Sequence, residues 1–203
     1  MSELFTTDEI KQALIARDPV LGTLIARVGP IRITLSDNYF EALLSAIVGQ
    51  QLSSKVADVI WGRFKALMDA DVQPEKIIAA PETDLRAIGL SNAKVAYAKA
   101  LSWAVMNGAV RLDALDAMED DEIVRHLTAV KGIGSWTAEM FLIFTLGRTD
   151  VFSCGDGGLQ RAAQWLYGIE PKRDELLRVS SAWKPYRTYG SLYLWEALNQ
   201  KLV

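Results

Sequence analysis

The sequence has very little cysteine or histidine, with only Cys154 and His126 among 203 residues. A single cysteine excludes an internal disulfide and any iron–sulfur or zinc site built from four cysteines. No apolar run approaches the ~20 residues of a membrane span. The first ten residues carry acids rather than the basic and apolar stretches of a signal peptide. We therefore expect a soluble, cytoplasmic chain that does not bind membranes.

The sequence also has no excess of basic over acidic residues, because its formal net charge is −3. Proteins that bind nucleic acid usually carry a positive surface for the phosphates. However, six of the 25 acidic residues lie between Asp113 and Glu122, which we interpret as a solvated helix entry. If this run faces away from the ligand, 22 Lys and Arg remain against 19 acids. The charge weighs mildly against a nucleic-acid partner without excluding one.

Apolar residues recur at helical spacing along most of the chain, and strand signals are poor. Capping residues and glycines place the helix ends. Thr6 and Glu9 form a capping box, Ser36 and Ser53 are predicted caps, and the segment 22–33 is left irregular. The remaining helices are predicted over 81–89, 91–107, 120–130, 136–146, 156–167, 174–183 and 186–201. The expected fold class is all-α, a single domain over 1–203 with two helical lobes and a cleft between them.

The most specific local signal is the segment Leu127–Phe141, LTAVKGIGSWTAEMF. Two helices joined by Gly-Ile-Gly can expose backbone N–H groups without an intervening side chain. The second helix begins there, so its positive dipole end and unbonded N–H groups point outward. Such an end binds phosphate without a large positive charge. We therefore expect a helix–hairpin–helix over about 121–147, and the alternative is an ordinary tight turn between two helices.

The cluster Gly-Ile-Gly-x-x-Thr-Ala resembles the helix–hairpin–helix DNA glycosylase superfamily, and the resemblance extends over residues 38–195. The chain is most similar to the 3-methyladenine DNA glycosylase II branch. The resemblance implies a two-lobed helical glycosylase that hydrolyses the N-glycosidic bond of alkylated bases in duplex DNA, as in base excision repair. The partner would be double-stranded DNA with a flipped base. We expect a monomer that requires no cofactor.

The resemblance assigns the catalytic carboxylate to Asp156, in the stretch DVFSCGDGGLQRA. Cleavage of a base from deoxyribose builds positive charge on the sugar, which a nearby carboxylate stabilises. The same group can orient or deprotonate water. Helix capping by Asp156 is the alternative, and the two roles are compatible. Asp150 is the local rival carboxylate.

The family also implies a base pocket lined by Trp136, Trp195 and Met140. Aromatic faces attract cationic purines through stacking and cation–π interaction, whereas core packing is the alternative role of these residues. Members that also cut the strand carry Lys at the position of Trp136, where it forms a Schiff base. Because Trp cannot do so, we expect a monofunctional enzyme without lyase activity.

The segment Ala46–Ser53 resembles the family's Gly-Gln-x-x-Ser motif. Its implied DNA wedge is Gln51, with Gln50 beside it, which would fill the hole left by the flipped base. The alternative is a polar turn in which both side chains bond to backbone. Ala46 stands where mismatch adenine glycosylases have a catalytic glutamate, so that activity is not expected.

The implied phosphate-binding hairpin consists of Lys131, Gly132, Ile133, Gly134 and Thr137. In the family, hairpin carbonyls hold a monovalent cation, and the matching carbonyls belong to Thr128, Val130 and Ile133. The resemblance thus allows Na⁺ or K⁺ at the hairpin, whereas the iron–sulfur cluster of another branch is not expected.

Three further functions stay open at this point. A non-catalytic helix–hairpin–helix module could bind damaged DNA, although such a module needs no carboxylate at position 156. A glycosylase could instead remove deaminated or etheno-modified bases, because lesion choice depends on pocket shape. A small-molecule enzyme is the weakest alternative, since the sequence has no cofactor fingerprint.

Overall fold

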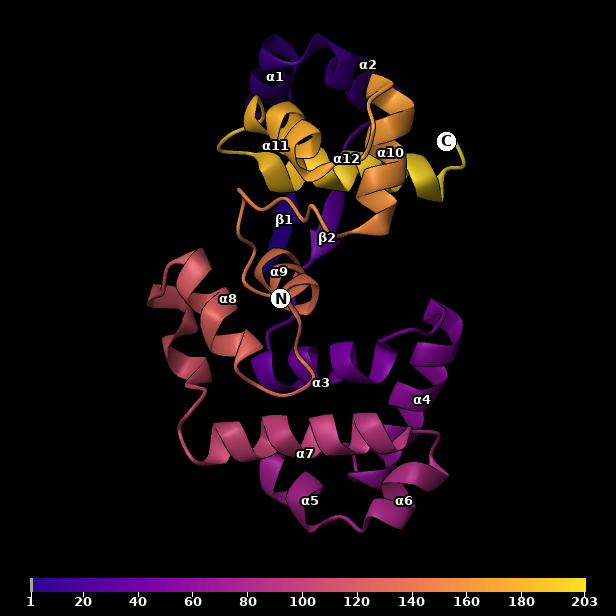
Figure 1. The fold of residues 1–203 in the computed structure, drawn as a ribbon, viewed down its shortest axis with the longest axis vertical. Helices are drawn as coiled ribbons and strands as arrows, with labels where there is room; N and C mark the ends of the chain where they lie inside the picture. Colours follow the sequence, from indigo (N-terminus) through magenta and orange to yellow (C-terminus); the bar gives the residue numbers. More distant parts are fainter. Residues whose placement is uncertain (1) are drawn as a thin grey trace. The chain divides into compact units, whose positions relative to one another are not determined.

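The computed structural model describes residues 2–203, and the chain folds into two compact units. Unit 1 combines the two ends of the chain, Met1–Asp37 and Leu142–Val203, and unit 2 is the continuous segment Asn38–Phe141. Both units are mainly helical (Figure 1). The expected helical fold is therefore confirmed, with one small sheet added in unit 1.

Unit 1 contains a two-stranded antiparallel sheet and five helices. The strands β1 and β2 pair with Leu4 opposite Ile33. The elements are β1 (Glu3–Phe5), α1 (Asp8–Arg17), α2 (Pro19–Val28), β2 (Arg32–Thr34), α10 (Gly157–Tyr167), α11 (Arg173–Ser181) and α12 (Arg187–Asn199).

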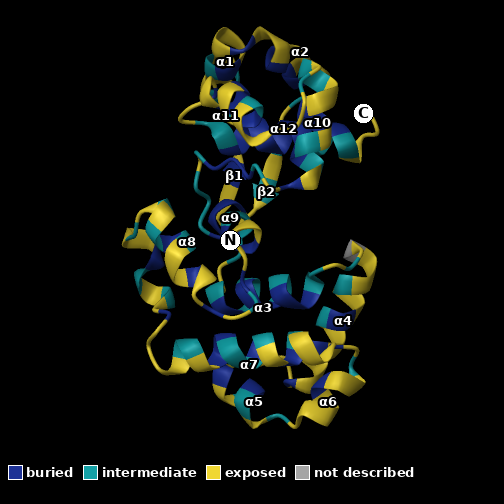
Figure 2. Cartoon of the chain, in the orientation of Figure 1, coloured by how far each residue is buried: buried dark blue, intermediate teal, exposed yellow. Residues whose placement is uncertain are grey.

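The core of unit 1 lies around α12, in which every residue from Thr188 to Leu194 is buried. Figure 2 shows this helix dark blue among the helices that cover it. A helix buried on all sides has no outward polar face, which explains its run of small and apolar residues. Gly190 is required for this packing, because a Cβ there would lie 2.3 Å from Trp183 Cε3. The helix therefore occupies a fixed place in the unit.

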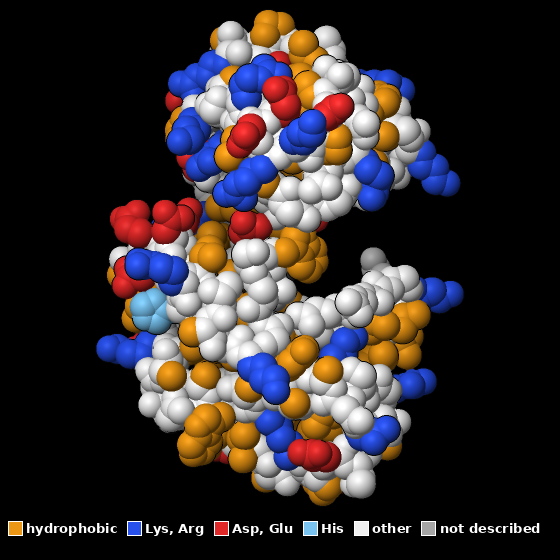
Figure 3. All heavy atoms as spheres, viewed as in Figure 1, with side chains coloured by type: hydrophobic (Ala, Val, Ile, Leu, Met, Phe, Trp, Pro, Cys, Tyr) orange, Lys and Arg blue, Asp and Glu red, His pale blue; other side chains and the backbone are white. Residues whose placement is uncertain are grey.

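Unit 2 contains six α-helices, one 3₁₀ helix and the first part of α9. Its elements are α3 (Tyr39–Gly49), α4 (Ser54–Leu67), α5 (Pro74–Ala79), α6 (Glu82–Ala87), α7 (Asn92–Met106), η1 (Leu112–Ala117), α8 (Asp120–Thr128) and α9 (Ser135–Phe144). The apolar stripe of α3 expected from helical spacing is buried, as predicted. It comprises Phe40, Leu43, Leu44, Ile47 and Val48. The acidic run spans η1 and the first turn of α8. On the face drawn in Figure 3, several acidic side chains lie close to a histidine.

Two predicted helix starts are wrong by one or two residues. Thr7, not Thr6, caps α1, because its hydroxyl accepts from Ile10 N at 3.2 Å, whereas the Thr6 hydroxyl bonds to the Ile31 backbone. Asn38, not Ser36, caps α3 through a 3.0 Å bond from Glu41 N. In both places two nearby polar residues could cap the helix. The sequence does not show which one does, because a contact with a distant residue holds the other one.

The segment 22–33 is not irregular as predicted, because most of it belongs to α2. Asp18 caps that helix by accepting from Leu21 N at 2.9 Å, and Pro19 starts it. Gly22 lets α1 come close, since a Cβ there would lie 3.3 Å from Ile15 Cγ2. The strands are three residues each, too short for the alternation by which strands are predicted.

Candidate functional site

Asp156 is the N-cap of α10 and is only 9% exposed. Its Oδ1 accepts a 2.8 Å hydrogen bond from Leu159 N, one of the N–H groups that the helix itself leaves without a partner. The positive end of the helix dipole favours a negative charge at this position. The structure thus combines the predicted cap with a carboxylate in a fixed orientation.

Trp195, on α12, donates a second hydrogen bond to the same oxygen, 3.0 Å from its Nε1 to Asp156 Oδ1. Its ring also lies against Phe144, with centroids 5.7 Å apart and planes 34° apart. The sequence predicts Trp195 as a pocket aromatic but does not indicate either contact. The sequence does not predict Phe144 as a site residue. It is exposed and follows Met140 by one helical turn in α9, which is the signal that could have identified it.

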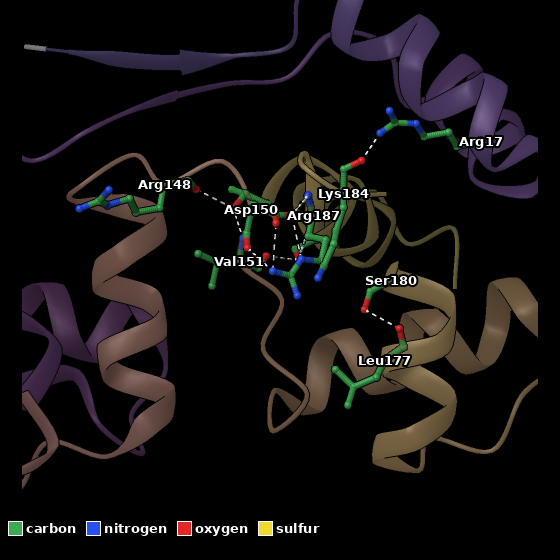
Figure 4. A network of polar contacts seen from close by, with 10 residues as sticks. Arg17, Arg148, Asp150, Val151, Leu177, Ser180, Lys184 and Arg187 are labelled. Carbon is green, nitrogen blue, oxygen red and sulfur yellow. Dashed lines mark hydrogen bonds and ion pairs between the residues drawn. The ribbon is translucent and has the colours of Figure 1, made fainter. Parts of the chain in front are cut away.

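Asp150, the rival carboxylate, is engaged in an ion pair with Arg187 at the start of α12. The distances are 2.8 Å from Arg187 Nε to Asp150 Oδ1 and 3.0 Å from Nη2 to Oδ2 (Figure 4). The Arg187 backbone N–H also donates to Oδ1, at 3.2 Å. This two-pronged geometry satisfies both carboxylate oxygens. The Asp150–Arg187 ion pair therefore attaches the loop that precedes Asp156 to the start of α12.

In unit 2 the hairpin joins α8 to α9 through a turn containing Gly132 and Gly134. Gly132 has φ +98°, and a Cβ there would lie 2.2 Å from Tyr97 Cγ. Gly134 has no atom within 4 Å of where a Cβ would be. The first glycine is thus required for packing against α7, and the second leaves open space beside the start of α9.

The predicted hairpin residues divide by exposure. Lys131 and Gly134 are exposed, whereas Ile133 and Thr137 are buried. The buried pair anchors the turn, and among the five predicted hairpin residues Lys131 alone presents an exposed side chain. Trp136, in the first turn of α9, is 44% exposed despite its size, and Met140 is partly buried. Trp136 is therefore not packed in the core, a property that it shares with Trp103 and Trp165.

The two glutamines after α3 differ in their surroundings. Gln50 donates from Nε2 to the Gly132 carbonyl at 2.9 Å, which links this turn to the hairpin within unit 2. Gln51 is exposed and has φ +57°, a left-handed conformation that is costly for a residue with a side chain. Strained backbone of this kind often occurs at functional sites.

The carbonyls of Thr128, Val130 and Ile133 lie at the end of α8 and in the following turn, where helix carbonyls carry partial negative charge. Ile133 N donates to the Val130 carbonyl at 3.1 Å, which curves the turn. These neutral oxygens are the ones that the family resemblance assigns to a monovalent cation. Among residues 2–203, no group of three or more His, Cys, Asp or Glu is arranged to hold a metal ion. Over the same residues, no helix has the length and apolar character needed to cross a membrane.

The glutamine turn, the hairpin and Asp156 all lie within a region that is typical of one protein superfamily. Residues 44–186 match the HhH-GPD superfamily of base excision DNA repair proteins, and the chain belongs to that superfamily. The matched region includes both glutamines, the hairpin and Asp156.

Several relatives bear a more specific name. The chain is 32% identical to DNA-3-methyladenine glycosylase 1 of Schizosaccharomyces pombe, over 85% of this chain and 78% of the relative. The crystal structure of a DNA-3-methyladenine glycosidase from Bacillus halodurans matches with TM-score 0.88 and 38% identity, covering 100% of this chain and 94% of that one. A Schizosaccharomyces pombe 3-methyladenine DNA glycosylase, solved in complex with abasic DNA, matches with TM-score 0.86 and 30% identity over 94% and 97% of the two chains.

Proposed function

We propose that this protein is a monofunctional DNA glycosylase that removes alkylated bases, of the 3-methyladenine and 7-methylguanine type, from duplex DNA. The observation that carries the proposal is the Asp156 carboxylate, held at the start of α10 by two N–H donors in a chain of the HhH-GPD superfamily. The names of the relatives support the choice of substrate.

The chemistry follows from where charge develops. As the base leaves, positive charge accumulates on the sugar, and a carboxylate fixed beside it stabilises that charge without reorganisation. The same carboxylate can orient the attacking water. An N-alkylated purine already carries positive charge, so it leaves without a strong general acid. Asp150 is excluded from this role because Arg187 occupies both of its oxygens.

Trp136 accounts for two properties of the proposed enzyme. It stands where strand-cutting members have Lys, so no Schiff base forms and the product is an intact strand with an abasic site. Its exposed ring provides a face for a cationic base. Stacking with cation–π attraction contributes on the order of 1–2 kcal/mol when desolvated. Met140, one turn further along α9, and Trp195, in unit 1, are also proposed to contact the base.

The hairpin and Gln51 are proposed to bind the DNA backbone and to fill the space that the flipped base leaves. The open backbone at Gly134 and the exposed Lys131 would bind a DNA phosphate at the start of α9. Na⁺ or K⁺ held by the carbonyls of Thr128, Val130 and Ile133 would add positive charge there. Gln51, on its strained turn, would fill the space left by the flipped base.

The test uses the purified protein and methylated duplex DNA, with chromatography of released bases. We expect release of 3-methyladenine and 7-methylguanine and abasic strands that are not cut. Borohydride should trap no covalent complex. Asp156→Asn should abolish release while DNA binding persists.

Asp150→Asn is the matched control, because it removes a neighbouring carboxylate that the mechanism does not use. It should lower stability but leave measurable excision. Equal loss in both variants would remove Asp156 from its special role. Binding of damaged DNA without any release, for methylated, deaminated and etheno-modified substrates alike, would instead identify a damage-binding module.

A further inference from the structure

Two donors from different parts of unit 1 converge on one oxygen of Asp156. Leu159 N belongs to the same helix, three residues along, and its bond follows from capping alone. Trp195 Nε1 comes from α12, 39 residues away in the sequence. Bonds from N–H groups to a carboxylate are stronger than neutral ones and restrict its rotation. The second donor is thus not a by-product of local helix geometry.

Gly158 makes room for this contact. A Cβ at that position would lie 3.0 Å from Asp156 Oδ1 and 3.3 Å from Trp195 Cδ1. Both distances, and the 3.3 Å to Leu198 Cδ1, are tighter than ordinary van der Waals contact, so any side chain would press on all three groups. The neighbouring Gly157 differs, since a Cβ there would meet only Arg161 Nη1 at 3.6 Å. Gly155 would meet nothing within 4 Å.

The helix that carries Trp195 is itself tied to the chain leading to Asp156. Besides the Asp150–Arg187 pair, the Thr188 hydroxyl donates to the Arg148 carbonyl at 2.6 Å and accepts from Val151 N at 3.0 Å. Figure 4 shows this network connecting the loop at Arg148–Val151 with the start of α12. The Trp195 ring also lies against Phe144, with ring centroids 5.7 Å apart. The indole is therefore held by contacts at its N–H and at its ring.

We propose that Trp195 is a positioning residue for the Asp156 carboxylate, and that Gly158 is present to permit their contact. This inference rests on the proposed function and adds to it a role distinct from stacking on the base. The indole N–H fixes the orientation of Oδ1, so that the carboxylate is already in place when positive charge develops on the sugar. The role of the ring face and the role of the N–H can be tested separately, because Trp195→Phe removes the N–H donor and keeps a smaller aromatic face.

The central experiment compares Trp195→Phe with the wild type in single-turnover excision. We expect a fall in rate of about tenfold or more, equal for 3-methyladenine and for neutral hypoxanthine, because the carboxylate serves both substrates. Affinity for DNA with an abasic-site analogue should change by less than about twofold, since an aromatic face is kept at this position. A loss confined to the cationic lesion would overturn the proposal in favour of stacking. An unchanged rate for both lesions would also overturn it.

Gly158→Ala provides a second test, with Gly157→Ala as its matched control in the same turn of α10. The first variant should lower excision of both lesions, and the second should excise like the wild type. If the two variants behave alike, Gly158 has no special role in the contact. Thermal melting of each variant separates a displaced carboxylate from general unfolding.

A spectroscopic readout tests the contact without activity. In a ¹H–¹⁵N spectrum, the indole signal of Trp195, identified by its loss in Trp195→Phe, should move upfield in Asp156→Ala. The indole signal of the exposed Trp165 should stay in place. An unmoved Trp195 signal would show that the hydrogen bond does not form. A wild type that releases no base would refute the proposed function, whereas active wild type with fully active Trp195→Phe would refute only the positioning role.

Discussion

Gln50 Nε2 donates a 2.9 Å hydrogen bond to the carbonyl of Gly132, 82 residues away in the sequence. The bond joins the turn after α3 to the hairpin within unit 2. Lys94 braces the same turn, because its Nζ donates to the Val48 carbonyl at 2.8 Å, and desolvation by burial lowers the pKa of this amine. Gln50 thus bonds to backbone, as the polar-turn alternative expected, while Gln51 beside it is exposed.

Gln50→Ala should loosen the link between the turn and the hairpin. We expect a loss of stability of about 1–2 kcal/mol, because the Gly132 carbonyl loses its donor. Gln50→Glu should cost more, since a carboxylate would face that carbonyl. Urea unfolding measures both effects. Equal stability of Gln50→Ala and the wild type would contradict the linking role.

Gln51→Gly should separate stability from activity. Glycine adopts φ +57° without strain, so the variant should gain about 0.5–1 kcal/mol in unfolding free energy. Loss of the side chain should at the same time slow single-turnover excision from duplex DNA. Gln51→Ala keeps the backbone strain and serves as the control. A glycine variant that is less stable than the alanine variant would show that the turn is not strained.

The two hairpin glycines should respond differently to the same substitution. Gly132→Ala places a methyl group into Tyr97 at a left-handed position, so we expect destabilisation of about 3 kcal/mol or more. Gly134→Ala should leave the melting temperature nearly unchanged, because the methyl group enters open space. It should instead weaken binding of undamaged duplex DNA by obstructing the backbone N–H groups. DNA affinity unaltered by Gly134→Ala would argue against phosphate binding at this turn.

Asp18→Ala should be strongly destabilising although it lies outside the candidate site. Its Oδ2 accepts from Tyr167 Oη and from Trp183 Nε1, both at 2.7 Å, and its Oδ1 caps α2. Removing the carboxylate leaves these buried donors without a partner, at a cost of about 3 kcal/mol or more. Asp8→Ala is the control, because the Asp8–Lys11 ion pair lies at the surface and its loss should not be measurable. Denaturant unfolding compares the two.

Unit 1 should lose stability at alkaline pH. Burial raises the pKa of Tyr167, to which the Asp18 carboxylate adds, and burial also raises the pKa of Tyr189 and of Tyr193. Unfolded tyrosines titrate near about pH 10. The contribution of these groups is therefore complete below that pH and falls above it, because the unfolded chain releases protons that the folded chain retains. Unfolding free energies between pH 8 and 11 measure the slope, which Tyr167→Phe should reduce.

The sequence correctly predicts the helices whose ends are marked by a capping residue or a glycine a few positions away. Ser91 caps α7 by accepting from Lys94 N at 3.3 Å, and Gly89 and Gly147 adopt positive φ after the helices that they end. Asp156 caps α10 as the sequence indicates. By contrast, the strands and α5 were missed because they are too short for periodicity to develop. The interlobe cleft and the absence of lyase activity stay predictions.

The sequence by itself determined that the protein is helical, that a glycine hairpin opens α9, and that the carboxylate of Asp156 begins α10. These features depend on residues a few positions apart, so helix geometry and capping are sufficient to predict them. Only the tertiary structure decided that Trp195 donates to Asp156 and that Gln50 donates to the Gly132 carbonyl. It also decided that Arg187 pairs with Asp150, and that the packing of Tyr97 leaves room only for glycine at position 132. Each of these contacts joins residues 35 or more positions apart, and only the packing of whole helices brings such residues together.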